Sequence, residues 1–86
     1  MKKTPNTIDV SFMKFVNGKL KPHRNVYTFH IRKDFREWLP LNAQYAIIGQ
    51  EKYVPQLVFI RKIYREDVED TGKKYGSFTA FQEVTL

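Results

Sequence analysis

The sequence has no cysteine and only two histidines. The missing cysteines exclude a disulfide framework and a thiolate metal site, and they favour a reducing compartment. Because His23 and His30 have too few partners at ligand spacing, we expect no zinc site. The four glycines stand singly, which excludes a glycine-rich phosphate loop. We therefore expect a protein that uses no metal and no cofactor.

Long apolar runs are also missing. No unbroken aliphatic or aromatic run exceeds four residues, and residues 57–60 form one of that length. A bilayer span needs about 20 apolar residues, so we expect no membrane segment. Residues 1–3 resemble the start of a signal peptide, but residues 4–7 (Thr-Pro-Asn-Thr) offer no apolar stretch after it. The sequence predicts a cytoplasmic protein whose residues 1–7 form a polar arm.

Positive charge is concentrated in the N-terminal part of the chain. The first 36 residues hold nine lysines and arginines against two aspartates, whereas the other 50 hold six bases and seven acids. The whole net charge of +6 therefore comes from the residues before position 37. Such a basic block is typical of a domain that meets a polyanion, because each base set against a phosphate releases counterions.

Alternation of apolar and polar residues predicts strands in the first third of the chain. Residues 8–13 alternate as a half-buried strand requires, and residues 26–32 do so again. Between them, Asn17-Gly18 is a pair that tolerates positive φ, which predicts a tight two-residue hairpin turn. Pro22 cannot donate to a ladder, so we expect an edge, a bulge or a loop there.

Residues 34–39 change to helical spacing, with Phe35, Trp38 and Leu39 on one face. Asp34 can cap this helix, and a glutamate three residues later completes a capping box. We expect a short helix whose Phe and Trp rings close an open end of the sheet.

The second half predicts further strands. Residues 44–48 and 53–64 form a pair, and the second is apolar on both faces, which is typical of a fully covered central strand. The acidic residues 66–70 predict a solvated loop. Residues 75–86 alternate again, and the residues expected on one face are Phe78, Ala80, Val84 and Leu86.

Together these segments predict a mainly β protein with one domain over residues 8–86. Five short antiparallel strands and one short helix, in a chain with 15% aromatic residues, suit a small five-stranded SH3-like or OB-like barrel.

Four short stretches carry a resemblance to a known group. They are Val-Tyr-Thr-Phe at residues 26–29, Leu-Asn-Ala at 41–43, Ala-Ile-Ile at 46–48, and Leu-Val-Phe-Ile at 57–60 running into Ile63. Through them the segment 26–64 resembles small, uncharacterised SH3-like β-barrel proteins of phages and mobile elements in low-GC bacteria. The resemblance implies a barrel fold, and it brings no catalytic residue.

Catalysis has little support in the sequence. Acid-base chemistry needs a histidine or carboxylate held in a pocket with a shifted pKa. His23 belongs to a predicted loop, where it is exposed or contacts phosphate, and His30 lies on the polar face of a strand. We therefore expect no enzymatic activity.

Bases and aromatic rings interleave on faces predicted to point outward. Exposed rings stack on bases while cations follow the backbone when small barrels hold single-stranded nucleic acid. In the alternative interpretation, Phe15 and Tyr64 belong to the core and the bases only confer solubility. The candidate binding residues are Lys14, Phe15, Lys19, Lys21, Arg24, His30, Arg32, Arg61 and Tyr64.

Two functions from different classes fit this pattern. In the first, the protein binds nucleic acid, single-stranded in preference to double-stranded, mainly through charge. In the second, it is a protein-binding inhibitor or adaptor, encoded by a phage or mobile element, that docks on an acidic surface of a larger protein or nucleic-acid-processing complex. The acidic residues 66–70 distinguish the two, because they would repel a phosphate backbone if they lay beside Lys19 and Arg24. The sequence does not indicate whether the protein is a monomer or an oligomer.

Overall fold

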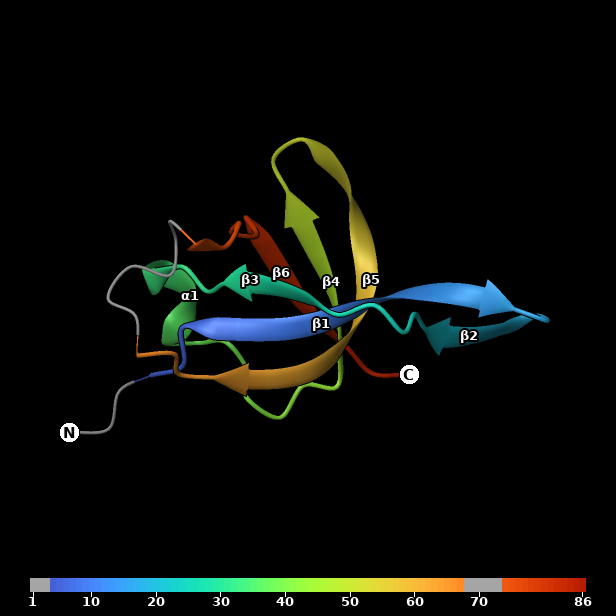
Figure 1. The fold of residues 1–86 in the computed structure, drawn as a ribbon, viewed down its shortest axis with the longest axis horizontal. Helices are drawn as coiled ribbons and strands as arrows, with labels where there is room; N and C mark the ends of the chain where they lie inside the picture. Colours follow the sequence, from blue (N-terminus) through green and yellow to red (C-terminus); the bar gives the residue numbers. More distant parts are fainter. Residues whose placement is uncertain (1–3, 68–73) are drawn as a thin grey trace.

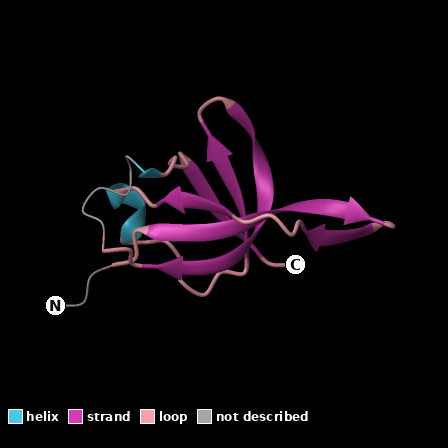
Figure 2. Cartoon of the chain, in the orientation of Figure 1, coloured by secondary structure: helices cyan, strands magenta, loops and turns pink. Residues whose placement is uncertain are grey.

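The computed structural model describes residues 4–67 and 74–86, which form one antiparallel sheet of six strands with a short helix (Figures 1 and 2). The described residues are mainly β, as predicted, but they form six strands rather than five. The elements in chain order are β1 (Thr7–Val16), β2 (Lys19–Pro22), β3 (Tyr27–His30), α1 (Lys33–Arg36), β4 (Tyr45–Gln50), β5 (Tyr53–Tyr64) and β6 (Ala80–Val84).

Strand β1 organises the sheet because it pairs with three other strands. Its residues 7–10 pair with β3 and its residues 13–16 pair with β2, both on the same edge. β5 runs along the other edge of β1 over residues 7–12. Residues 13–16 are therefore paired only with β2, and the end of this hairpin projects away from the rest of the sheet (Figure 1).

On its other side, β5 pairs with β4, and β6 forms the next strand. The sequence placed residues 53–64 correctly in a central strand. A single parallel bridge between His30 and Ser77 joins the chain just before β6 to β3. No continuous ladder joins these two strands in the described part of the chain, so the curved sheet does not close into a barrel.

The core lies on one face of the curved sheet. Its Phe78 ring packs 5.2 Å from Phe35 and 5.8 Å from Phe81, measured between ring centroids. Full burial of a large apolar side chain contributes about 1.5–3 kcal/mol, so this face supplies most of the stability. The apolar side chains with no exposed surface are Ile8, Val10, Ala46, Val58 and Phe78.

The helix only partly matches its prediction. Phe35 and Leu39 are buried, as expected for residues that cover one end of the core. Trp38 was expected beside them, but 53% of it is exposed, and its ring packs edge-on at 5.1 Å from Phe35. The helix ends at Arg36, so Trp38 and Leu39 both lie beyond it, and of these two side chains only that of Leu39 turns inward.

The predicted capping box is also wrong. Arg32 occupies the N-cap position, and no side chain caps the helix. Asp34 lies one residue inside the helix and pairs with Arg32, with its carboxylate oxygen 3.2 Å from the guanidinium Nε.

The C-terminal strand is shorter than predicted, and its inward face differs. The structure buries Phe78 and Phe81 but exposes Ala80, which the alternation had placed beside Phe78. The chain changes partners just before β6: Gly76 accepts a hydrogen bond from β3, and Thr79 donates one to β4. This change interrupts the strand period, so alternation counted from Phe78 fails beyond it.

The predicted polar arm is wrong for its last two residues, because Asn6 and Thr7 are buried. The Asn6 side chain donates to the Glu66 carbonyl at 3.1 Å and accepts from the Glu66 N–H at 2.8 Å. Its oxygen also accepts from the Thr7 hydroxyl at 2.8 Å. Residues 1–3 of the predicted arm lie outside the described residues.

Candidate nucleic-acid interface

The projecting hairpin, residues 13–22, is called the arm below. Its turn is the predicted Asn17-Gly18 pair, with φ of 52° at Asn17 and 78° at Gly18. Both values are positive, as a two-residue turn that matches strand twist requires. The prediction of a tight turn is confirmed, and the turn sets a register in which Val16 faces Lys19.

The arm has two chemically different faces. Side chains alternate along each strand, so Lys14 and Val16 lie on one face of β1, and Met13 and Phe15 on the other. Cross-strand partners share a face, which fixes the positions of the β2 residues. The basic face consists of Lys14, Val16, Lys19 and Lys21, and the apolar face consists of Met13, Phe15, Leu20 and Pro22.

Two lysines on the basic face are direct neighbours. Lys14 and Lys21 are opposite partners in the antiparallel ladder. Cβ atoms of such partners are about 4.5–5.5 Å apart, and like charges at this spacing are destabilising. In the described part of the chain, the ion pairs are Arg32–Asp34 and Lys74–Glu66, so neither lysine is neutralised by an acid there. The arm therefore carries a concentrated positive charge at some cost in stability.

Arg61 lies where the arm joins the sheet. The register between β1 and β5 shifts between Asp9 and Val10, which makes Arg61 an extra residue in the ladder, and its side chain reaches toward the base of the arm. Its guanidinium donates to the Ser11 hydroxyl at 3.0 Å and to the His23 carbonyl at 3.3 Å, and it lies 5.1 Å from the centre of the Phe59 ring. Arg61 therefore holds the loop after β2 in place, and Arg24 in that loop is exposed.

The other three predicted residues lie far from the arm. His30 and Tyr64 both face Thr7, at the opposite end of β1 from Lys19. Arg32 lies beside α1 and pairs with Asp34. The nine candidates therefore divide into six at or near the arm and three at the far end, rather than forming one surface.

Tyr64 is held by a carboxylate. Its hydroxyl donates to the Asp9 carboxylate at 3.2 Å, and Asp9 also accepts from Thr28 at 2.8 Å. Burial, together with the charge of Asp9, raises the pKa of Tyr64 to about 12. The phenol stays neutral at physiological pH, and its position is fixed by this bond.

Acidic residue Glu66 lies at the same far end. It is tied to Asn6, just before β1, and its carboxylate accepts from the Lys74 ammonium at 2.9 Å and from the Tyr75 hydroxyl at 3.3 Å. These bonds lower the pKa of Glu66. Since β1 rises about 3.3 Å per residue, its ten residues separate Glu66 from the tip of the arm by about 30 Å. Residues 68–70 of the predicted acidic loop lie outside the described residues.

A group of partly open aromatic and apolar residues on β4 and β5 was not predicted from the sequence. The outward side of β5 was expected to be covered, yet Phe59 is only partly buried and packs 5.4 Å from Tyr45, while Ile47 nearby is 37% exposed. The sequence did contain a signal for this surface, because residues 57–60 are apolar on both faces. A second apolar face marks either a covered strand or a binding surface, and the pattern alone does not separate them.

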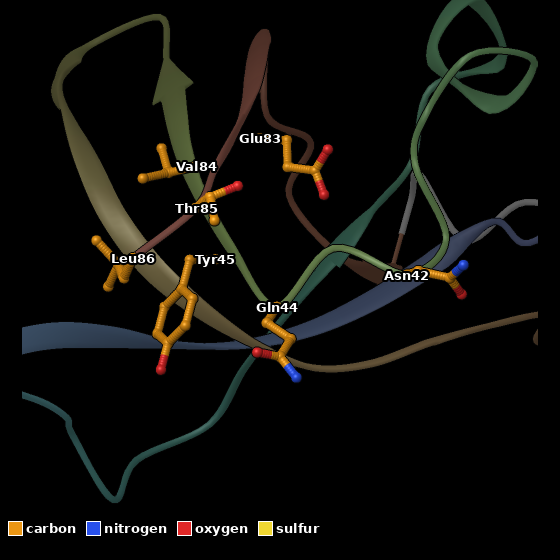
Figure 3. Close-up of a pocket in the computed structure, with 7 residues that line it drawn as sticks. All are labelled: Asn42, Gln44, Tyr45, Glu83, Val84, Thr85 and Leu86. Carbon is orange, nitrogen blue, oxygen red and sulfur yellow. The ribbon is translucent and has the colours of Figure 1, made fainter.

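One hollow lies between β1, just before the arm, and the β4–β5 hairpin. It has a volume of about 330 Å³ and is lined by Phe12, Gln50, Tyr53 and Gln56. Another, of about 190 Å³, lies between the chain entering β4 and the C-terminal tail (Figure 3). The Glu83 carboxylate contributes to the lining of this second hollow, which makes it unsuited to a phosphate. The residues around it are Asn42, Gln44, Tyr45, Glu83, Val84, Thr85 and Leu86.

Two absences in the described part of the chain concern metal ions and membranes. Within residues 4–67 and 74–86, no cluster of three or more His, Cys, Asp or Glu side chains could hold a metal ion. In the same residues, no helix combines the length and the apolar character that a bilayer span demands.

Comparison of the chain with models of known families, with curated proteins and with solved structures found no match in any of the three.

Proposed function

We propose that this protein binds nucleic acid through the basic face of the arm. The observation that carries the proposal is the projecting arm, whose three lysines have no acidic partner among the described residues and lie far from Glu66. Lys14, Lys19 and Lys21 lie at one end, on a hairpin that projects from the sheet, and Glu66 lies at the other. The sequence left open whether the acidic residues lie close enough to repel a phosphate backbone bound at the lysines. At about 30 Å this repulsion is weak, because that distance exceeds the Debye length at physiological salt.

The mechanism is electrostatic. Each lysine that approaches a phosphate releases condensed counterions, and this release supplies most of the affinity. The close placement of Lys14 and Lys21 favours the same function, because a polyanion relieves the repulsion between them. Arg24 and Arg61 extend the positive charge from the arm to the sheet.

We also propose that the fold is related to small SH3-like or OB-like barrels and that the protein is cytoplasmic. OB-like barrels hold single strands on one sheet face, and the SH3-like barrels that residues 26–64 resemble have a similar curved sheet. A chain without cysteines suits a reducing compartment, where nucleic acid is accessible. No step in this function is catalytic.

A protein partner is the second candidate, and one observation favours it. The face of the arm opposite the lysines is apolar, with Phe15 75% exposed and Leu20 directly opposite at 40% exposed. Exposed aromatic residues are enriched at protein interfaces. An inhibitor or adaptor would insert this face into an acidic surface of a larger protein or nucleic-acid-processing complex, with the lysines contacting the rim.

The test is binding of short oligonucleotides, single-stranded and duplex, measured across a range of salt concentrations. Wild-type protein should bind more weakly as salt rises, with log affinity falling linearly with log salt. The double variant Lys19→Gln/Lys21→Gln should flatten that slope by about 1–2.

A matched control removes the same charge at the far end. Arg32→Gln/Lys33→Gln lowers the net charge by the same two units beside α1, so it should leave the slope almost unchanged. Equal effects of the two double variants would contradict a local interface. If the wild-type protein binds no nucleic acid at low salt but retains a protein partner through Phe15, the second candidate replaces the first.

A further inference from the structure

The hollow between Phe12 and the β4–β5 hairpin lies on the same face as the lysines of the arm. Phe12 precedes Lys14 by two residues on β1, so their side chains point to the same side, about 7 Å apart along the strand. Lys21 is the cross-strand partner of Lys14. A chain that follows the lysines toward the sheet therefore reaches Phe12 next.

The hollow is lined by flat apolar surfaces. Phe12 is partly buried against the core, and its ring lies 5.0 Å from that of Tyr27, which fixes its orientation. Across the hollow, Tyr53 is 70% exposed and stands at the base of the β4–β5 turn, opposite Gln50 in the ladder. Two rings, one on β1 and one on the β4–β5 hairpin, thus border one open space.

The remaining lining groups are amides. Gln50 and Gln56 each carry a carbonyl acceptor and an NH2 donor, and both lie on the β4–β5 hairpin on the side of the hollow. Such paired donors and acceptors match the edges of nucleobases, whereas a carboxylate would repel a nearby phosphate. Among the residues that line this hollow there is no acidic side chain.

We propose that the hollow receives an unpaired base of a single-stranded nucleic acid whose backbone follows Lys14 and Lys21. The base stacks on Tyr53 and Phe12, and the amides of Gln50 and Gln56 bind its edge. This inference rests on the proposed function, since the lysines bring the strand to the hollow. It adds that the preferred ligand is single-stranded, because a base held in a duplex stack cannot enter between β1 and the β4–β5 hairpin.

The experiment compares wild type with Tyr53→Ala, using one single-stranded oligonucleotide with a fluorescent adenine analogue at its centre and the corresponding duplex. Wild type should bind the single strand more tightly and quench the analogue by stacking. Tyr53→Ala should weaken single-strand binding by about 5- to 150-fold and abolish the quenching, because one stacked base is lost. The slope against salt should not change, since no charge is removed.

Two further variants control for the ring and its position. Tyr53→Phe keeps the ring and should restore single-strand affinity and quenching. Phe15→Ala removes an exposed ring from the opposite face of the arm and should change neither. Because Tyr53 and Phe15 are both largely exposed, neither alanine variant should unfold the protein.

The failures of the two proposals differ. If wild type binds the single strand and the duplex equally, without quenching, and Tyr53→Ala leaves both affinities unchanged, the base-binding hollow is wrong while the basic interface stands. If wild type binds neither nucleic acid at low salt, both proposals are wrong.

Discussion

Reversing the charge of one arm lysine should stabilise the protein while it weakens binding. Lys14 and Lys21 are opposite each other on β1 and β2, and no described acidic residue pairs with either. Lys21→Glu replaces this like-charge pair with an attractive one. We therefore expect the free energy of unfolding to rise, although most substitutions lower it.

The size of the gain follows from the cross-strand geometry. Two unit charges about 7 Å apart in water interact with about 0.6 kcal/mol, so changing repulsion to attraction gives about 1 kcal/mol at low salt. Screening at physiological ionic strength reduces this gain to about 0.5 kcal/mol. For a domain of this size, the melting temperature should rise by about 4–8 °C at low salt and by about half as much at physiological salt.

Thermal unfolding of four proteins checks the argument. They are wild type, Lys14→Glu, Lys21→Glu and the double variant, each at low and at physiological salt. The double variant restores a like-charge pair, so its stability should return close to that of wild type. Lys19→Glu serves as a control with the same change in net charge, because Lys19 faces Val16 and should give a smaller gain. Additive effects of the two single changes, or gains that do not depend on salt, would refute the reasoning.

Three other outcomes follow from the fold. Gly18→Val should lower the melting temperature more than Lys19→Val does, because Gly18 has φ of 78° and a β-branched residue is strained there. Phe35→Ala should cost about 3–5 kcal/mol in denaturant unfolding, and Trp38→Ala clearly less, with native Trp38 fluorescence at the wavelength of a partly exposed indole. Stability should fall as pH rises from about 10 toward 12, since the unfolded chain releases the Tyr64 proton near pH 10 while the folded pKa is about 12. Tyr64→Phe should lose less stability over that interval in thermal unfolding at each pH, and an equal loss would contradict the raised pKa that burial and Asp9 give Tyr64.

Local rules predicted the hairpin and most of the strands. Asn17-Gly18 readily adopts a left-handed backbone at two successive positions, and this strongly favours a tight two-residue turn. Residues 26–32 and 53–64 also became strands close to their predicted bounds, because their alternation or apolar content is strong. Only for residues 53–64 did the sequence also predict the position within the sheet, because their two apolar faces indicate a central strand.

Long-range contacts account for the failures. Asn6 was expected in a polar N-terminal segment, residues 1–7. It is buried instead, because its side chain forms hydrogen bonds with Glu66, which is 60 residues away in sequence. Ala80 was assigned inward because nothing local shows that the chain changes partners before it. The candidate site failed for the same reason: His30, Arg32 and Tyr64 match the arm residues in type, and only the pairing of β1 separates them by the length of the strand.

The pairing of β1 also determines how the arm can change in length. Residues 13–16 contact only β2 in the ladder, so insertions there leave the register of the sheet with β3 and β5 intact. One added residue on each strand would extend the reach by about 3.3 Å but turn every side chain nearer the tip to the opposite face. Two added residues on each strand would keep the faces and provide room for another pair of lysines. Variation in such arms should therefore occur in steps of four residues, with the core sequence unchanged.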